Sequence, residues 1–185
     1  MVSILLDSLD GTGKTTLCNL LTNKLHAVSI KTPDTTIAGI RDYCVHTHPH
    51  MREGYYMVAN HLCSEKMGQL KRAGINCVID RYFPSTYAYL YGKDLDVSLD
   101  IELEWPSCIR KPDYSFVLIL DNDERISRII KRGNMNEEEI FVNNNSVISD
   151  RINAFYIKLG CIPLYIKNDD SPEDILNMIM SHIEL

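Results

Sequence analysis

A ten-residue stretch near the start of the chain, DSLDGTGKTT at residues 7–16, limits most strongly what the rest can fold into. An apolar run precedes it and leucines at helical spacing follow it, which predicts a strand, a glycine-rich loop and a helix in succession. Gly11 and Gly13 allow the loop to curl so that its N–H groups point inward, and the following helix adds the positive end of its dipole. We therefore predict that this stretch binds phosphate groups.

The loop pattern assigns chemistry to individual residues. In loops of the form Gly-x-x-x-x-Gly-Lys-Ser/Thr, the lysine reaches the β- and γ-phosphates of a nucleotide and the next hydroxyl ligates Mg²⁺. These roles fall to Lys14 and Thr15, whereas Ser8 stands where the first glycine is expected. Serine is small, so we still expect the loop to form. The predicted ATP-binding residues of the loop are Asp10, Gly11, Thr12, Gly13, Lys14, Thr15 and Thr16.

Composition narrows the class of protein. A chain of 185 residues with 45% apolar residues fits one globular domain over residues 1–185. Its net charge of −6 argues against a nucleic-acid partner held by the overall field. No apolar segment approaches transmembrane length, the N-terminal apolar run is too short for a signal peptide, and six scattered cysteines are typical of a reducing compartment. We expect a cytoplasmic protein without a membrane or nucleic-acid partner.

Strand and helix patterns alternate along the chain. The predicted strands cover residues 2–7, 27–30, 77–79, 115–120 and 162–166. The predicted helices cover residues 13–26, 36–45, 53–73, 85–91, 99–105, 123–132, 137–159 with a possible break at 143–145, and a last segment that begins at Ser171. A break is expected at 46–50 and a mobile turn at 133–136. Such alternation predicts an α/β fold with a parallel sheet covered by helices on both faces.

A second polar motif follows the third predicted strand. Ligands of parallel sheets bind at the carboxyl ends of the strands, so Asp80 and Arg81 should meet the phosphate loop there. Asp80 could assist Thr15 by holding Mg²⁺ through a water molecule. The guanidinium of Arg81 is suited to bind an acceptor phosphate. Near the predicted turn, Arg125, Arg128, Lys131 and Arg132 form a basic stripe. We interpret residues around 128–140 as a closing lid.

Together these motifs resemble those of the thymidylate kinases. The matching segments, in chain order, are Leu9–Thr16, Thr36–Gly39, Ala59–His61, Asp80–Tyr82 with Ser85, Ala88 and Tyr89, Lys111–Asp113, and Lys131–Gly133. Several spaced motifs in the right order are more specific than a phosphate loop alone.

The resemblance implies a three-layer P-loop kinase fold with a five-stranded parallel sheet. It implies transfer of the γ-phosphate of ATP to dTMP with Mg²⁺, and a homodimer. Asp10 would contact the sugar 3′-hydroxyl, Arg81 the acceptor phosphate, and Arg132 the region of the adenine. The residues predicted to bind the acceptor are Asp10, Met57, Asn60, His61, Arg81, Ser85 and Tyr89. Those predicted to act in catalysis are Lys14, Asp80, Arg81, Arg128 and Arg132, with Thr15 and Asp80 at the metal.

Departures from the family pattern keep alternatives open. His61 replaces an arginine that helps hold thymine, and Met57 falls where an aromatic residue often stacks on the base. A kinase for another deoxynucleoside monophosphate, or a deoxynucleoside kinase, therefore remains an alternative. The source of the transition-state positive charge is also open, with Arg128 and Arg132 as candidates. A non-catalytic P-loop nucleotide-binding protein is the alternative from another class.

Overall fold

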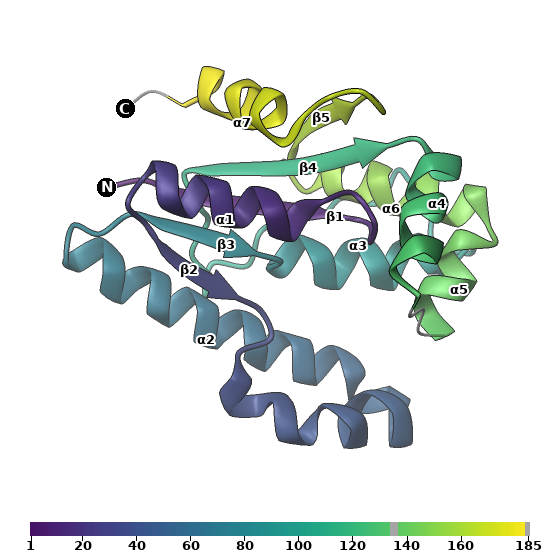
Figure 1. Cartoon of the computed structure of the whole chain (residues 1–185). Helices are drawn as coiled ribbons and strands as arrows, with labels where there is room; N and C mark the ends of the chain where they lie inside the picture. Colours follow the sequence, from purple (N-terminus) through teal and green to yellow (C-terminus); the bar gives the residue numbers. More distant parts are fainter. Residues whose placement is uncertain (134–136, 184–185) are drawn as a thin grey trace.

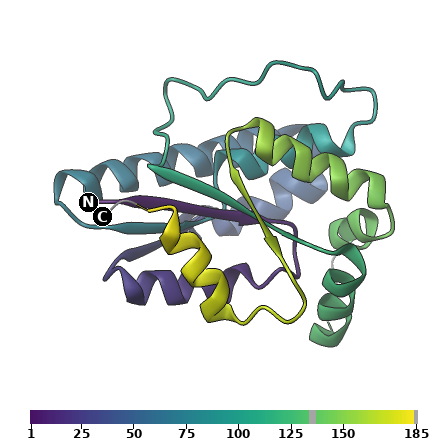
Figure 2. The same cartoon turned by 90° about the horizontal axis from the view of Figure 1, so that it is seen from above.

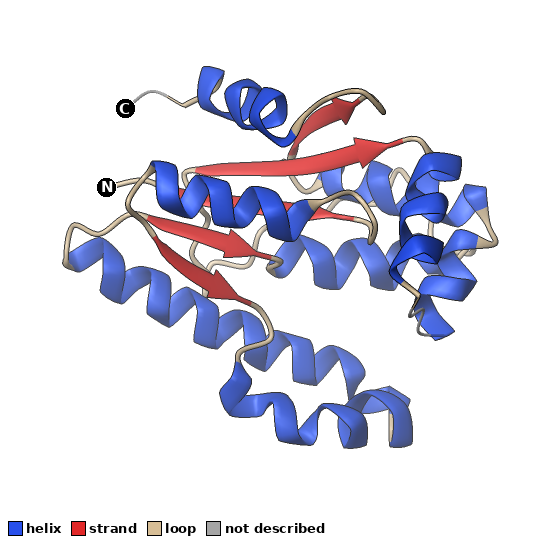
Figure 3. Cartoon of the chain, viewed as in Figure 1, coloured by secondary structure: helices blue, strands red, loops and turns tan. Residues whose placement is uncertain are grey.

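The computed structural model of the protein describes residues 1–133 and 137–183 and has a parallel sheet at its centre. The sheet order is β2-β3-β1-β4-β5, and each neighbouring pair is parallel. The strands are β1 (Ser3–Ser8), β2 (Val28–Lys31), β3 (Cys77–Asp80), β4 (Tyr114–Leu120) and β5 (Ile162–Ile166). The predicted fold class is confirmed, and the ends of β1 and β3 lie side by side as expected (Figure 3).

Helices cover both faces of this sheet and complete the three layers (Figures 1 and 2). The helices are α1 (Lys14–Lys24), α2 (Arg52–Arg72), α3 (Phe83–Lys93), α4 (Asn122–Arg132), α5 (Glu137–Asn143), α6 (Ser146–Lys158) and α7 (Pro172–Ser181). One face carries α1 and α7, and the other carries α2, α3 and α6. The predicted break between 137 and 159 is confirmed, since α5 and α6 are separate helices.

The central strand β1 is buried on both sides, which explains its continuous apolar sequence. Ile4 and Leu6 pack with α1 and α7, while Leu5, on the opposite face, packs with α2. Because successive side chains of a strand point to opposite faces, one run of apolar residues serves two cores. Each fully buried side chain of this size stabilises the fold by about 1.5–3 kcal/mol.

The C-terminal unit follows its sequence signals closely. Pro163 lies in β5, which is an edge strand, where the missing N–H of a proline is tolerated. Ser171 caps α7, and its hydroxyl oxygen accepts a hydrogen bond from the backbone N–H of Asp174 at 3.2 Å. The Asp174 carboxylate accepts in return from the Ser171 N–H at 2.9 Å. This reciprocal capping box confirms the predicted start of the helix.

The segment between β2 and α2 differs from its prediction. In place of one helix at 36–45 and a break at 46–50, the chain forms a 3₁₀-helix at Thr35–Ile40, a π-helical turn at Tyr43–Thr47 and a 3₁₀ turn at Pro49–Met51. Cys44 and Val45 pack against Tyr55 of α2 in a small separate core. Short turns bring both side chains onto α2, and this contact outweighs the regular helical pattern.

The predicted helix at 99–105 is wrong. Residues 94–113 form a long irregular connection between α3 and β4, which arches away from the sheet in Figure 2. Arg151 of α6 donates hydrogen bonds to the carbonyls of Asp94 at 2.8 Å and Val97 at 2.6 Å. The Trp105 indole donates to the Ile109 carbonyl at 2.8 Å. Side-chain donors thus satisfy carbonyls of the irregular connection on both sides of residues 99–105.

Gly92 is expected to be indispensable for packing between α3 and α6. A Cβ built there lies 2.4 Å from Cγ1 and 3.0 Å from the backbone nitrogen of Ile152. Gly92→Ala should lower the free energy of unfolding by about 1–3 kcal/mol through overpacking, measured by chemical denaturation. Gly54→Ala in α2 is the matched control, because its Cβ meets nothing within 4 Å. If both variants unfold at the same denaturant concentration, the close helix approach is not what requires Gly92.

The predicted mobile turn begins at Gly133, which ends α4 in the left-handed conformation with φ of 82°. Its remaining residues, 134–136, lie outside the described residues, and the lid around 128–140 therefore stays a prediction. None of the described helices is both long and apolar enough to cross a bilayer.

Candidate active site

The phosphate loop links β1 to α1 at the carboxyl edge of the sheet. Gly11 and Gly13 have φ of 89° and 87°, a left-handed conformation that other residues adopt only with strain. Ser8, at the first glycine position, belongs to β1 and pairs with Leu118 of β4. Its buried hydroxyl accepts a hydrogen bond from Thr12 at 2.7 Å. Serine therefore fits this position, and its hydroxyl adds a hydrogen bond within the loop.

Lys14 and Asp80 form the first of two close ion pairs in the described part of the site, and a longer contact joins Arg81 Nη1 to Asp7 Oδ1 at 3.9 Å. The Lys14 ammonium donates to the Asp80 carboxylate, and the two side chains are only 10% and 7% exposed. Thr15, the next residue of α1, is exposed to solvent. A threonine hydroxyl and a carboxylate are hard oxygen donors of the kind that Mg²⁺ prefers, so the residues present fit the predicted metal.

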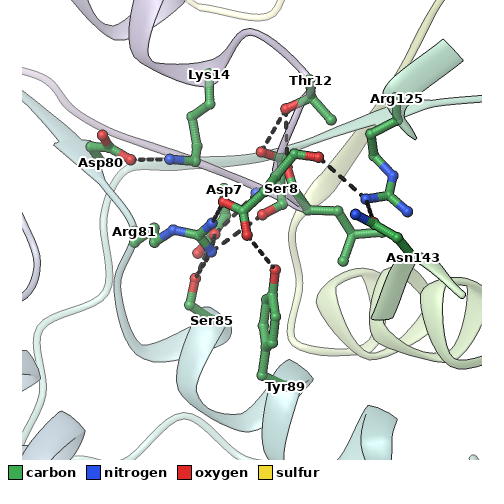
Figure 4. A network of polar contacts seen from close by, with 12 residues as sticks. Asp7, Ser8, Thr12, Lys14, Asp80, Arg81, Ser85, Tyr89, Arg125 and Asn143 are labelled. Atoms are coloured by element: carbon green, nitrogen blue, oxygen red, sulfur yellow. Dashed lines mark hydrogen bonds and ion pairs between the residues drawn. The ribbon is translucent and has the colours of Figure 1, made fainter. Parts of the chain in front are cut away.

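Arg81 and Asp10 form the second close ion pair, with Nη2 of Arg81 at 2.5 Å from Oδ1 of Asp10. Figure 4 shows Arg81 beside Ser85. The backbone of Arg81 has φ of 66°, an uncommon conformation for a residue other than glycine. Nη1 donates to the Ser8 carbonyl at 3.3 Å. Burial acts to lower the pKa of Arg81, but the surrounding acidic groups, Asp10 first, hold it well above its usual value.

A buried carboxylate, Asp7, lies behind this pair. Its Oδ1 accepts hydrogen bonds from the Ser85 hydroxyl at 2.5 Å and the Tyr156 hydroxyl at 2.9 Å. Burial raises the pKa of Asp7, and the nearby Arg81 guanidinium partly opposes that rise. Neither Asp7 nor Tyr156 was among the predicted site residues, because their contact joins the first strand to the sixth helix.

A pocket of about 640 Å³ opens beside Asp10 and Arg81. Its lining includes four predicted residues: Asp10, Arg81, Ser85 and Tyr89. The lining residues that were not among the predicted site residues are Lys31, Thr32, Pro33, Arg41, His50, Arg52, Glu53, Tyr56, Tyr82, Thr86, Leu90 and Lys93. Five of the lining side chains are Lys or Arg and two are carboxylates, which leaves an excess of three positive charges with neutral histidine. Such a pocket attracts an anion, and the phosphate loop lies next to it.

Comparison with known families decides the family of the chain. The thymidylate kinase family model matches residues 6–160. The chain belongs to the thymidylate kinase family. The match contains both ion pairs and most of the residues that line the pocket.

Individual relatives agree with this assignment. The chain is 26% identical over 194 residues to human UMP-CMP kinase 2, mitochondrial, a match that covers 98% of the chain and 42% of the relative. The chain thus spans less than half the length of this relative. Among solved structures, thymidylate kinase from Candida albicans has a TM-score of 0.71 at 19% identity, covering 98% of this chain and 90% of that one. Deoxyadenosine kinase from M. mycoides with bound products has a TM-score of 0.64 at 17% identity, with 97% of each chain covered. These likenesses confirm the P-loop kinase fold.

Three of the residues predicted to bind the acceptor do not line the pocket. The Asn60 side chain is fully buried and its amide donates to the Thr86 hydroxyl at 3.0 Å, while Met57 packs on the apolar core of α2. His61 is exposed and is not among the residues that line the pocket. Tyr56 and Thr86 line it instead. Tyr82, Thr86, Tyr89 and Lys93 recur at helical spacing in the sequence. This spacing could have predicted that they line one wall of the pocket.

The residues of the basic stripe lie in different environments in the structure. Arg125 is only 1% exposed, so its placement on a solvent-facing lid stripe is corrected. Arg128 pairs with Glu124 at 2.9 Å, and Arg132 is exposed near the end of α4. Neither Arg128 nor Arg132 lines the pocket, and their roles in catalysis and at adenine remain proposals.

Proposed function

We propose that this thymidylate kinase family member transfers the γ-phosphate of ATP to a nucleoside monophosphate, with dTMP as the first candidate. The observation that carries the proposal is the cationic pocket that contains Arg81 and opens beside the loop of Lys14. A donor phosphate on the loop and an acceptor phosphate on Arg81 would meet between the two ion pairs. Phosphoryl transfer depends mainly on such positioning and charge neutralisation.

The proposed reaction exchanges the partners of both cations. Lys14 would leave Asp80 for the β- and γ-phosphates of ATP, and Arg81 would turn from Asp10 to the acceptor phosphate. An oxygen of that phosphate attacks the γ-phosphorus in line, and ADP leaves with the bridging oxygen. Asp10 is then free to accept a hydrogen bond from the sugar 3′-hydroxyl. Mg²⁺, held by Thr15 and through water by Asp80, would neutralise charge on the β- and γ-oxygens.

Charge favours a monophosphate over an unphosphorylated acceptor. A deoxynucleoside carries no phosphate, so it would leave the excess positive charge of the pocket unmatched. The base is less constrained, because the human relative is named for UMP and CMP and His61 lies outside the pocket lining. A non-catalytic nucleotide-binding protein would not need the second cation, Arg81, beside Lys14.

A coupled assay with ATP against a panel of nucleosides and monophosphates tests these alternatives. The highest kcat/KM for dTMP would support the first candidate. A preference for UMP, CMP or another monophosphate would change the base but keep the reaction. Preference for a nucleoside would establish the deoxynucleoside kinase alternative. ATP binding without turnover of any acceptor would overturn the proposed reaction.

Metal removal should abolish turnover. We expect EDTA to lower the rate below detection and added Mg²⁺ to restore it, because the donor phosphates would otherwise carry unneutralised charge. Thr15→Ala should raise the Mg²⁺ concentration needed for half-maximal rate. Thr22→Ala is the matched control, since the Thr22 hydroxyl donates to the Cys18 carbonyl at 2.7 Å within α1. Equal Mg²⁺ requirements in the two variants would contradict the assignment of Thr15.

Recognition of the base is expected to involve Tyr56 rather than His61. Tyr56 lines the pocket, where its ring could stack on a planar base, and the Arg52 guanidinium lies 5.6 Å from the ring centre. Tyr56→Ala should raise the acceptor KM about tenfold, given that base–aromatic stacking contributes about 1–3 kcal/mol. His61→Arg and His61→Ala should leave the ranking of substrates unchanged. A shift toward dTMP in His61→Arg would instead show that residue 61 contacts the base.

Assembly and location complete the proposal. Val58 and Leu62, one turn apart on α2, are 51% and 40% exposed, and a homodimer could cover them. Analytical ultracentrifugation of the protein and of Leu62→Glu tests this association. The six cysteines are free in the structure, which supports a reducing location such as the cytoplasm.

A further inference from the structure

Arg125 is a buried cation whose hydrogen-bond partners among the described residues are all neutral groups. Its side chain donates to four oxygens, and no described carboxylate lies within ion-pair distance. These acceptors are the Asp10 carbonyl at 3.3 Å, Asn143 Oδ1 at 2.5 Å, Asn122 Oδ1 at 3.0 Å and the Ser149 hydroxyl at 3.2 Å. Its Nε has no partner in the described part of the chain. Burial lowers the pKa of Arg125, as expected where the charged form is poorly solvated.

Burial takes the charge of Arg125 out of water at a cost in free energy, and no described carboxylate within ion-pair distance offsets that cost. The side chain instead satisfies four neutral acceptors. A role in positioning the groups that it contacts would account for a cation here.

The contacts of Arg125 indicate that role. Its guanidinium joins α4, the end of α5 and the start of α6 to the backbone of Asp10 in the phosphate loop. Figure 4 shows the contact of Arg125 with Asn143. The Asp10 carboxylate in turn holds Arg81 at 2.5 Å. Gly11 lies directly on Arg125, because a Cβ built at Gly11 would be 2.7 Å from the Arg125 carbonyl oxygen and 3.0 Å from its Cγ.

We propose that Arg125 is a positioning residue, which fixes the backbone of Asp10 so that, before the acceptor binds, the Asp10 carboxylate holds Arg81 at the pocket where the acceptor phosphate would enter. The part that concerns the acceptor rests on the proposed function. Arg125 itself does not touch the acceptor, since it is buried behind the loop and does not line the pocket.

The test begins with Arg125→Met, which keeps the Cγ that packs on Gly11 and removes only the guanidinium. We expect the acceptor KM to rise about tenfold while the ATP KM stays within twofold, and the melting temperature to fall because four oxygens lose their donor. Arg125→Lys should recover part of the loss. If Arg125→Met does not fold, the kinetics of Arg125→Lys decide the test. Arg151→Met is the matched control, because Arg151 donates to the carbonyls of Asp94 and Val97, far along the chain from the loop.

A double-mutant cycle separates positioning from a structural role. In the Asp10→Ala background, Arg125→Met should change the acceptor KM less than twofold, because the intermediary carboxylate is gone. An equal effect in both backgrounds, or parallel losses of melting temperature and of both KM values, would overturn the proposal.

Crystal structures of the ligand-free wild type and Arg125→Met provide a readout that does not need activity. The contact between Asp10 and Arg81 should be lost in the variant, and an unchanged contact would overturn the proposal. If the wild type phosphorylates no monophosphate, the proposed function fails, whereas the crystallographic comparison still decides whether Arg125 positions this pair.

Discussion

Lys14→Ala is expected to lower kcat at least about 100-fold at saturating ATP and acceptor. Lys14 is the cation nearest the position proposed for the transferring phosphoryl group, and removing one stabilising donor from such a site costs about 10²–10³ in rate. The loss should appear in kcat and kcat/KM together, because the interaction is strongest in the transition state. Steady-state kinetics with the preferred acceptor measures it.

A change in folding must be separated from this chemical effect. Lys14→Ala leaves the nearly buried carboxylate of Asp80 unpaired, so its melting temperature has to be measured alongside. Lys24→Ala, at the exposed far end of α1, should leave kcat unchanged. Undiminished turnover in folded Lys14→Ala would refute the donor site.

Arg81→Ala is expected to raise the acceptor KM about 10- to 100-fold while the ATP dissociation constant changes less than threefold. The expected size follows from hydrogen bonds to charged groups, which contribute about 1.5–3 kcal/mol each. The asymmetry follows from position, because Arg81 lines the pocket proposed for the acceptor whereas Lys14 lies on the loop proposed for the donor. Kinetics with varied acceptor and calorimetry with ATP measure the two quantities.

A lysine at position 81 tests whether the planar guanidinium, and not only its charge, binds the acceptor phosphate. Arg81→Lys retains a charge but not the planar fork that binds phosphate in a bidentate manner, so its acceptor KM should lie between those of Ala and wild type. Arg72→Ala, at the exposed end of α2, is the matched control. Equal losses of acceptor and ATP binding in Arg81→Ala would assign Arg81 to both substrates or to the fold.

The phosphate loop illustrates what could be predicted from sequence. Its conformation depends on residues within the loop, where two glycines adopt left-handed φ and a hydroxyl-to-hydroxyl hydrogen bond joins Ser8 to Thr12. The convergence of Asp80 and Arg81 on this loop was also predictable, because the ends of neighbouring parallel strands share one edge of the sheet. The same reasoning could not foresee the turns at 35–51, where contact with α2 replaces regular helix.

Arg125 and the pocket cations show where sequence reasoning failed. A helix that carries four basic residues is typical of a solvated surface, yet Arg125 is buried against the loop. No sequence pattern indicated that Lys31, Arg41 and Arg52 line a pocket. They reach one pocket only because the segment after β2 folds back over α2.

The sequence by itself determined the order of strands and helices, the phosphate loop, and the edge of the sheet where Lys14, Asp80 and Arg81 meet. Each of these depends on periodicity, backbone preference or the direction of parallel strands, which are properties of short segments. Only the tertiary structure decided that Tyr156 bonds to Asp7, 149 positions away, and that Arg125 holds the Asp10 carbonyl, 115 positions away. Such contacts depend on how whole helices pack, because packing determines which polar side chains are buried and which partners remain within hydrogen-bond distance.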